Sequence, residues 1–362
     1  MARKTRSVIK TAPGTWDGAS VEIGMGFMPN SRLSVETKVI TEGAIMAALT
    51  SVLALAGIFI PVINPIVMLI WTLPVVVICI RHGMRAGAIT IAVAGIIILF
   101  IASPINAFYM LLGSVGPALF IGNGFYNKWS TEKTVFYAAI AAVIGLALDL
   151  FISTRIMGIS VAQMYSVEPE TIEEMVKTFS DSGLMSRMYS SQEELREALV
   201  SISDTMRIMI PAGLVLGGVF TALTNYIVAH IVLRRLKEPV PPFTRLAAFR
   251  LPMPFLLGFV SGLAMLILGM SYADKPALQT AGQNITAVFL VLYAFQGLGL
   301  THYFIGRFAA PHMQRTFKIL LVVGIIMSNF YLLILISFAG VIDAFIDFRM
   351  LDIGTIRKNR IL

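Results

Sequence analysis

Long apolar runs recur along the chain and determine its expected fold. Nine of them cover residues 40–61, 65–80, 86–102, 105–125, 134–153, 208–233, 252–272, 281–305 and 319–345. A helix needs about 20 apolar residues to cross a hydrocarbon core of about 30 Å. The runs are continuous and lack the alternating pattern of membrane strands. The pattern therefore predicts an all-α fold, a polytopic transmembrane helix bundle.

The number of spans depends on the shortest and the longest runs. Runs 65–80 and 86–102 are short for a crossing, so one of them could be re-entrant. Run 319–345 is long for one crossing and too short for two. The segment after it is basic, and nine spans would place that segment outside, whereas eight would place it inside. We expect eight or nine spans.

The overall composition narrows the class of protein. Of the 362 residues, 57% are hydrophobic and 13% are charged, whereas soluble globular chains carry about 25% charged residues. This difference excludes a cytosolic enzyme, a disordered chain and a secreted disulfide scaffold. The single cysteine, Cys79, lies inside an apolar run. An internal disulfide and a multi-cysteine zinc site are therefore excluded as well.

The net charge of +8 follows the membrane topology. If the N-terminus is cytoplasmic, 18 of the 28 lysines and arginines fall inside, namely Arg3, Lys4, Arg6, Lys10, Arg32, Lys38, Arg81, Arg85, Lys128, Lys133, Arg234, Arg235, Lys237, Arg245, Arg250, Arg307, Arg315 and Lys318. Such a bias is typical of cytoplasmic loops. We therefore expect a multi-pass membrane protein with a cytoplasmic N-terminus and no nucleic-acid partner.

Three segments differ from the membrane domain, which we place at residues 39–350. Residues 1–38 are basic and interrupted by glycine and proline, so we expect a flexible cytoplasmic lead. They contain no apolar stretch of the kind that a signal peptide needs. Residues 351–362 form a basic tail, and residues 155–207 form a hydrophilic insert within the membrane domain.

The insert is acidic and amphipathic. It holds nine acidic and five basic residues, which favours a position outside the membrane on the extracytoplasmic side. Pro169 suits the first position of a helix, and Ser191 with Glu194 matches a capping box. We expect two short amphipathic helices across the outer mouth of the bundle, either as a lid over a pocket or as a solvated interfacial cap.

Few charges lie within the apolar runs, and Asp149 is the clearest of them. Charged residues in a bilayer usually face the bundle interior or a wet cavity. Asp149 contacts a substrate or ion at the outer mouth, or it pairs with Arg155, or it reaches the interface. Neutral polar residues either line the same cavity or hydrogen-bond between helices. The candidate substrate-binding residues are Asp149, Arg155, Asn106, Asn225, Asn284 and Gln296.

The sequence contains no pattern typical of an enzyme. The four histidines form no metal-binding pattern, and nucleophile motifs and Walker-type phosphate loops are missing. We expect no catalytic residues, no metal site and no cofactor. Asp343 and Asp347 share a helix face, and we expect them to pair with Arg349 and the basic tail rather than to bind a metal.

Four segments together resemble a known family. They are Thr41-Glu42-Gly43-Ala44, Arg81-His82-Gly83-Met84-Arg85-Ala86-Gly87, Gln296-Gly297-Leu298 and Gly340-Val341-Ile342-Asp343-Ala344-Phe345-Ile346-Asp347-Phe348-Arg349. On these segments the chain resembles the YybS-like family of bacterial membrane proteins, also called the DUF2232 family. The resemblance covers residues 38–350 apart from the insert. It implies a bacterial cell membrane location and a family without an established biochemical function.

The N-terminal half also resembles the S components of energy-coupling-factor vitamin transporters. That resemblance implies a small helical bundle that binds a substrate. It also implies that the first helix docks on a coupling subunit through an alanine-x-x-x-alanine pattern. Ala44 and Ala48 match this pattern. The chain departs from S components by its additional C-terminal spans and its acidic insert, and it has no recognisable vitamin-binding signature.

Two functions remain open from the sequence. The first is a transporter-like component that binds a small molecule for uptake and relies on separate energy-coupling subunits, because the chain has no ATPase motif. The second is a non-transporting scaffold or regulator that recruits membrane or cytoplasmic partners through its basic loops. The lipid bilayer is a partner in both.

Overall fold

The computed structural model describes residues 31–181, 191–243, 246–272, 276–328 and 331–349. Throughout these residues the regular elements are helices, which confirms the all-α prediction. The membrane helices are α1 (Ser31–Phe59), α2 (Asn64–Ile70), α3 (Leu73–His82), α4 (Met84–Ile101), α5 (Pro104–Tyr126), α6 (Thr131–Met157), α11 (Ile210–Arg235), α12 (Met253–Ser271), α13 (Pro276–Phe308), α14 (Gln314–Met327) and α15 (Tyr331–Ile346). Short 3-10 turns lie at η1 (Pro61–Ile63) and η2 (Leu246–Ala248).

Eight segments of the described residues are long and apolar enough to cross a membrane. One of them, Pro61–His82, is built from η1, α2 and α3, because Pro65 and Pro74 lie near the starts of successive short helices. Large apolar side chains face outward on every side, with Phe100 82% and Leu257 68% exposed. Lipid tails would cover such a surface, as the sequence predicts.

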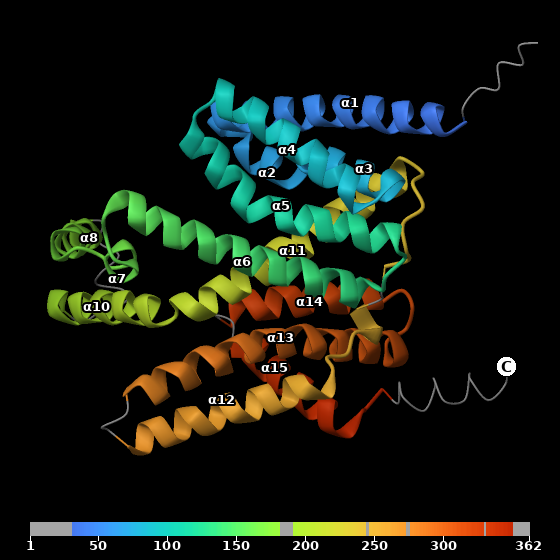
Figure 1. The fold of residues 1–362 in the computed structure, drawn as a ribbon. Helices are drawn as coiled ribbons and strands as arrows, with labels where there is room; N and C mark the ends of the chain where they lie inside the picture. Colours follow the sequence, from blue (N-terminus) through green and yellow to red (C-terminus); the bar gives the residue numbers. More distant parts are fainter. Residues whose placement is uncertain (1–30, 182–190, 244–245, 273–275, 329–330, 350–362) are drawn as a thin grey trace, which may run out of the picture.

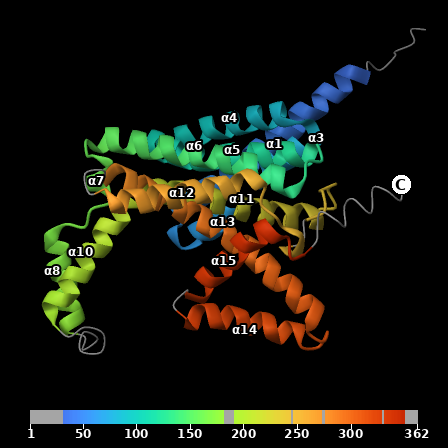
Figure 2. The ribbon, with the colours of Figure 1, turned by 90° about the horizontal axis from the view of Figure 1, so that it is seen from below.

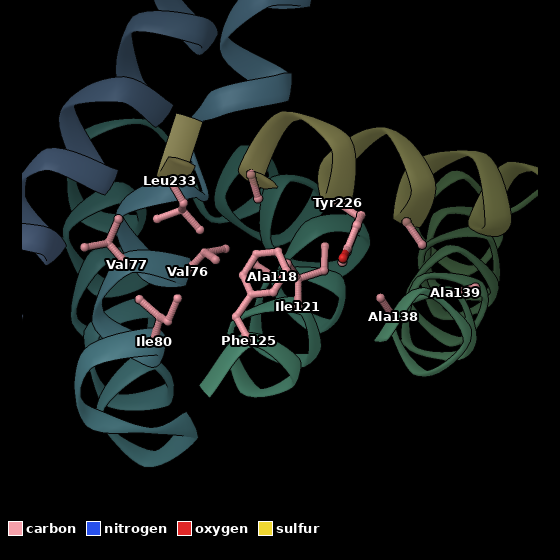
Figure 3. Packing of buried hydrophobic residues seen from close by; sticks show 12 residues of the cluster. Val76, Val77, Ile80, Ala118, Ile121, Phe125, Ala138, Ala139, Tyr226 and Leu233 are labelled. Atoms are coloured by element: carbon pink, nitrogen blue, oxygen red, sulfur yellow. The ribbon is translucent and has the colours of Figure 1, made fainter. Parts of the chain in front are cut away.

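The N-terminal bundle combines α1 to α6 with α11, which returns to it after the insert (Figure 1). Its core brings Val76 and Ile80 of α3 against Ile121 and Phe125 of α5 and Tyr226 of α11 (Figure 3). Helices α5 and α6 approach to backbone contact, because a Cβ at Gly145 would lie 2.2 Å from the carbonyl oxygen of Leu112. Six membrane segments therefore form one packed unit.

A second core lies between α12, α13 and α15. It contains Leu256 and Phe259 of α12, Tyr293 of α13, and Val341 and Ala344 of α15. Small residues let α13 and α15 cross closely. A Cβ at Gly297 would lie only 1.9 Å from the carbonyl oxygen of Ile336.

The run at 319–345 is not one continuous helix. It is divided between α14 and α15, whose axes differ by 116°. Ser328 ends α14, and its side chain accepts a hydrogen bond from the backbone amide of Leu332 in α15. In Figure 2, α14 runs away from the end of α13 and α15 returns obliquely toward the same end of the bundle. The pair is a broken span or a re-entrant loop.

The insert forms a helical hairpin of α8 (Pro169–Asp181) and α10 (Gln192–Ile208), preceded by the short helix α7 (Val161–Met164). The predicted starts are confirmed, since α8 begins at Pro169 and the Ser191 side chain accepts from the Glu194 amide. The expected placement across the mouth is not what the structure has. The apolar faces pack on each other through Ile172, Val176 and Leu195, and the hairpin projects beyond the bundle (Figure 2).

The bundle has two chemically different ends. The hairpin lies at one end, with the turns after α1, α4 and α12 (Figure 1). The turns after α3, α5, α11 and α13 lie at the other, which we call the basic end (Figure 1). It carries exposed Lys128, Arg234, Arg235, Lys237 and Arg315. Basic residues occur on every second turn along the sequence, and the fold gathers these turns at one end of the bundle.

Candidate functional site

Asp149 lies on α6, two turns before the hairpin end of that helix. Its side chain is partly buried, and its Oδ1 atom is buried without a hydrogen-bond partner. Ser153 Oγ, one turn further on, lies 2.7 Å from the Asp149 carbonyl oxygen and 3.1 Å from the hydroxyl of Tyr109 on α5. One carboxylate oxygen of Asp149 therefore lacks a partner, one turn away from a serine whose hydroxyl joins α6 to α5.

Arg155 does not neutralise this carboxylate. Its side chain is exposed, and its guanidinium lies 5.2 Å from the centre of the Phe151 ring. Six residues along a helix correspond to a rotation of about 240°, so Asp149 and Arg155 point to different sides of α6. Asn106 precedes Tyr109 by three residues on α5, and its side chain lies outside the described part of the structure.

Asn284 makes hydrogen bonds between helices. Its Oδ1 accepts from the amide of Ala212 at 2.8 Å, and its Nδ2 donates to the carbonyl oxygens of Ile208 and Thr280, each at 2.9 Å. Asn284 of α13 thereby bonds to the backbone at the end of α10 and at the start of α11. Asn225 is half-buried on α11.

Gln296 belongs to a buried polar cluster near the basic end. Its Nε2 donates to Asp343 Oδ2 at 3.0 Å, and its Oε1 accepts from the amide of Leu251 at 3.0 Å. Arg349 donates to the same Asp343 oxygen at 2.6 Å, with both side chains fully buried. Arg349 also donates to the Ala247 carbonyl oxygen at 2.9 Å. The expected pairing of Asp343 with Arg349 is confirmed.

Asp347 forms the outer part of the same cluster. Arg250 lies 3.2 Å from its carboxylate and is within 3.5 Å of the Ala344 carbonyl oxygen. Within the described residues no group of three or more His, Cys, Asp or Glu side chains could hold a metal ion. Asp347 thus pairs with Arg250, which the sequence did not suggest, and the basic tail that was its expected partner lies outside the described residues.

A second polar cluster joins α1 and α3 at the basic end. The Glu42 carboxylate lies 2.9 Å from His82 Nε2 and 3.6 Å from Arg81. Arg81 also donates to Glu238, from Nε at 2.9 Å. Lys38, one turn before Glu42, lies 3.9 Å from it. Glu238 follows α11, and we did not identify it from the sequence because no periodic pattern places it near residue 81.

The segment 236–252 connects these two clusters, and we call it the strap. Glu238 attaches its start to Arg81 of the N-terminal bundle. Ala247 and Leu251 attach its other half to Arg349 and Gln296. The four segments on which the family resemblance rests are thus brought together as two pairs, each bound to one part of the strap.

Ala44 and Ala48 lie on the outer face of α1. Both are exposed, whereas Ala47 and Ala54 face the core. Exposed Ile45 and Val52 accompany them. The small residues therefore belong to an outward-facing surface rather than to the packing of the bundle.

Ion pairs link the two helices of the hairpin. Arg196 of α10 donates to Glu173 of α8 at 2.7 Å and lies 3.6 Å from Glu193. The hydrogen bond and the negative charge of Glu173 raise the pKa of the Arg196 guanidinium. Arg207 lies 3.3 Å from Asp204. The other acidic residues of the hairpin leave its surface strongly negative.

Comparison with known proteins agrees with this architecture. The model of a family described as "Predicted membrane protein (DUF2232)" matches residues 48–344, which is most of the chain. This protein belongs to the DUF2232 family. It is similar to the uncharacterized protein YybS of Bacillus subtilis (strain 168), with 23% identity over 214 residues, covering 58% of this chain and 68% of YybS. No solved structure matches the chain significantly.

The region matched by the DUF2232 model includes Asp149, Gln296 and Asp343, and it begins at Ala48. Glu42 and Arg349 lie just outside it. The polar clusters therefore extend beyond the matched region at both ends, although each has at least one member within it.

Proposed function

We propose that this DUF2232 protein is a membrane component that binds a small molecule for uptake, with Asp149 at its binding site. The observation that carries the proposal is the buried Oδ1 atom of Asp149, which has no partner among the described residues. An unpaired buried acceptor costs about 1–3 kcal/mol, and more when it is charged. A bound solute that donates to Asp149 would remove this cost.

The proposed binding site lies in the six-segment N-terminal bundle, whose size supports the resemblance to S components. The exposed Ala44 and Ala48 on α1 support docking on a separate energy-coupling subunit, because small residues permit close approach between membrane helices. Gln296 and Asn284 lie in contacts with α15 and the α10–α11 junction, so we assign them structural roles in this proposal.

The proposed orientation places the basic end in the cytoplasm and the hairpin outside the cell membrane. Exposed lysines and arginines gather at the basic end, and such residues are enriched on cytoplasmic sides. Asp149 then lies toward the outer face, where a solute arriving from outside would reach it.

The test compares wild-type protein with the variant Asp149→Asn, purified in mild detergent. Native mass spectrometry should detect a small molecule bound to the wild type and depleted in the variant. The control is Asn225→Asp, which places a carboxylate on α11 instead. A small molecule retained equally by wild type and Asp149→Asn would contradict the assigned site, and its absence from all preparations would argue against the function.

A second candidate function is a scaffold that recruits cytoplasmic partners. The exposed side chains of Arg234, Arg235 and Lys237 at the basic end favour it. If the protein is a scaffold, the variant with all three residues replaced by glutamine should fail to complement a deletion strain. Asp149→Asn should complement it fully. The reverse result would favour solute uptake.

A further inference from the structure

We infer that the solute bound at Asp149 is a small primary ammonium compound with an apolar body, and that the acidic hairpin concentrates it. This inference rests on the proposed solute-binding function and specifies its ligand. Three observations carry it: the state of the carboxylate, the nature of its surroundings, and the charge of the hairpin.

The carboxylate requires a hydrogen-bond donor. An ionised aspartate is purely an acceptor, and Oδ1 of Asp149 is buried without a donor. Hydrogen bonds between a carboxylate and a cationic nitrogen are shorter and about twice as strong as neutral ones. A positively charged N–H donor is thus the partner that best matches this buried atom.

A bare metal ion fits this position poorly. Magnesium and calcium require six or more oxygen ligands, and the described residues contain no group of acidic, histidine or cysteine side chains able to hold a metal. The hydroxyl groups of Ser153 and Tyr109 already lie within 3.1 Å of each other. A single free acceptor suits one ammonium N–H.

The surroundings favour a ligand with an apolar body. Leu146, one turn before Asp149, lies between α5 and α11, because Cβ atoms at Gly113 and Gly217 would lie 3.9 and 3.6 Å from its methyl groups. Asp149 therefore lies one helical turn from an apolar contact between α5, α6 and α11. An alkyl chain attached to the ammonium group would lie against this junction and bury apolar surface.

The hairpin supplies a negative potential outside this position. It follows the helix that carries Asp149, with the short helix α7 between them (Figure 1). Its acidic residues are exposed, and those without an ion pair in the described structure include Glu168, Glu170, Glu174 and Glu197. Surface potentials of this kind raise the local concentration of oppositely charged solutes and their rates of association.

The inference is tested by calorimetric titration of the full chain in nanodiscs of uncharged lipid. The probes are n-pentylammonium, 1-pentanol and pentanoate, which have five carbon atoms each and differ in charge. We expect pentylammonium to bind the wild type at least about tenfold more tightly than Asp149→Asn, since 1.4 kcal/mol corresponds to a factor of ten. The control Glu132→Gln removes an exposed carboxylate at the opposite end of the same helix and should retain tight binding. Size-exclusion profiles verify that every variant is folded.

The outcomes separate the inference from the function on which it rests. Asp149-dependent binding of pentanoate or pentanol in preference to pentylammonium would overturn the ammonium assignment and leave the solute-binding function intact. Failure of all three probes, together with a wild-type preparation free of any bound small molecule, would overturn both.

The contribution of the hairpin has its own measurement. The variant with Glu168, Glu170, Glu174 and Glu197 replaced by glutamine should bind pentylammonium several-fold more weakly at about 10 mM salt. The difference should vanish at about 500 mM salt, where the Debye length is only a few ångströms. Equal affinity of this variant and the wild type at low salt would refute the concentrating role.

Discussion

Arg349 donates a 2.6 Å hydrogen bond to Asp343, and both side chains are fully buried. Asp343 lies in the last turn of α15 and Arg349 lies just after the helix ends. The ion pair therefore holds the chain after α15 against the bundle. Gln296 of α13 donates to the same oxygen. The pair thereby joins α13, α15 and the strap.

We expect Arg349→Leu to destabilise the protein by about 3–5 kcal/mol, because it leaves the Asp343 carboxylate buried without its cation. The double variant Arg349→Leu, Asp343→Leu should recover most of this loss, since two apolar groups replace the pair. The measurement is thermal unfolding followed by fluorescence size exclusion. Equal stability of the wild type and the single variant would show that the pair is dispensable.

Gly297→Ala should separate α13 from α15. The added Cβ would lie 1.9 Å from the Ile336 carbonyl oxygen, and overpacking of this kind costs about 1–3 kcal/mol. The matched control is Gly306→Ala on the same helix, where nothing lies within 4 Å of the new Cβ and stability should be retained or increase slightly. A lower melting temperature for the control than for Gly297→Ala would contradict the packing described here.

Asn284→Leu should loosen the junction between α10 and α11. It leaves the amide of Ala212 and the carbonyl oxygen of Ile208 without their side-chain partner, at an expected cost of about 1–3 kcal/mol. Hydrogen–deuterium exchange should accelerate around residue 212. Unchanged exchange there would mean that Asn284 does not hold the junction.

The chain should have both termini on one side of the membrane. Because α15 turns back after the 116° bend, Arg349 reaches the strap at the basic end. Protease-cleavable tags appended at each terminus should therefore be accessible from the same side of sealed vesicles. Opposite accessibility would establish that α14 and α15 form one complete span.

Several features could be predicted from the sequence because their causes are local. Pro169 and Ser191 determine the starts of the hairpin helices. The closeness of Asp343 and Arg349 in the sequence anticipated their pairing, whereas the pairing of Asp347 with Arg250 was not anticipated. Glu238 could not be predicted, because its contact with Arg81 joins residues 157 positions apart.

The candidate site was predicted in part. Asp149 stands out in the sequence because a charge in an apolar run needs a partner. Its pairing with Arg155 remained open until the helix placed them on different sides. The sequence allowed Asn284 and Gln296 either to line a cavity or to hydrogen-bond between helices, and the structure has the second arrangement. Their hydrogen bonds to the α10–α11 junction and to Asp343 depend on helix neighbours that hydropathy does not specify.

The sequence by itself determined that this chain is a multi-helix membrane protein with basic residues on alternating turns, because bilayer thickness and the cost of buried charge act on each segment separately. Only the tertiary structure decided that α14 and α15 fold back and that the hairpin helices pack on each other. It also decided that two polar clusters are joined through the strap. These features depend on which helix surfaces meet. Those surfaces belong to segments that are distant along the chain, so no local sequence pattern specifies their contacts.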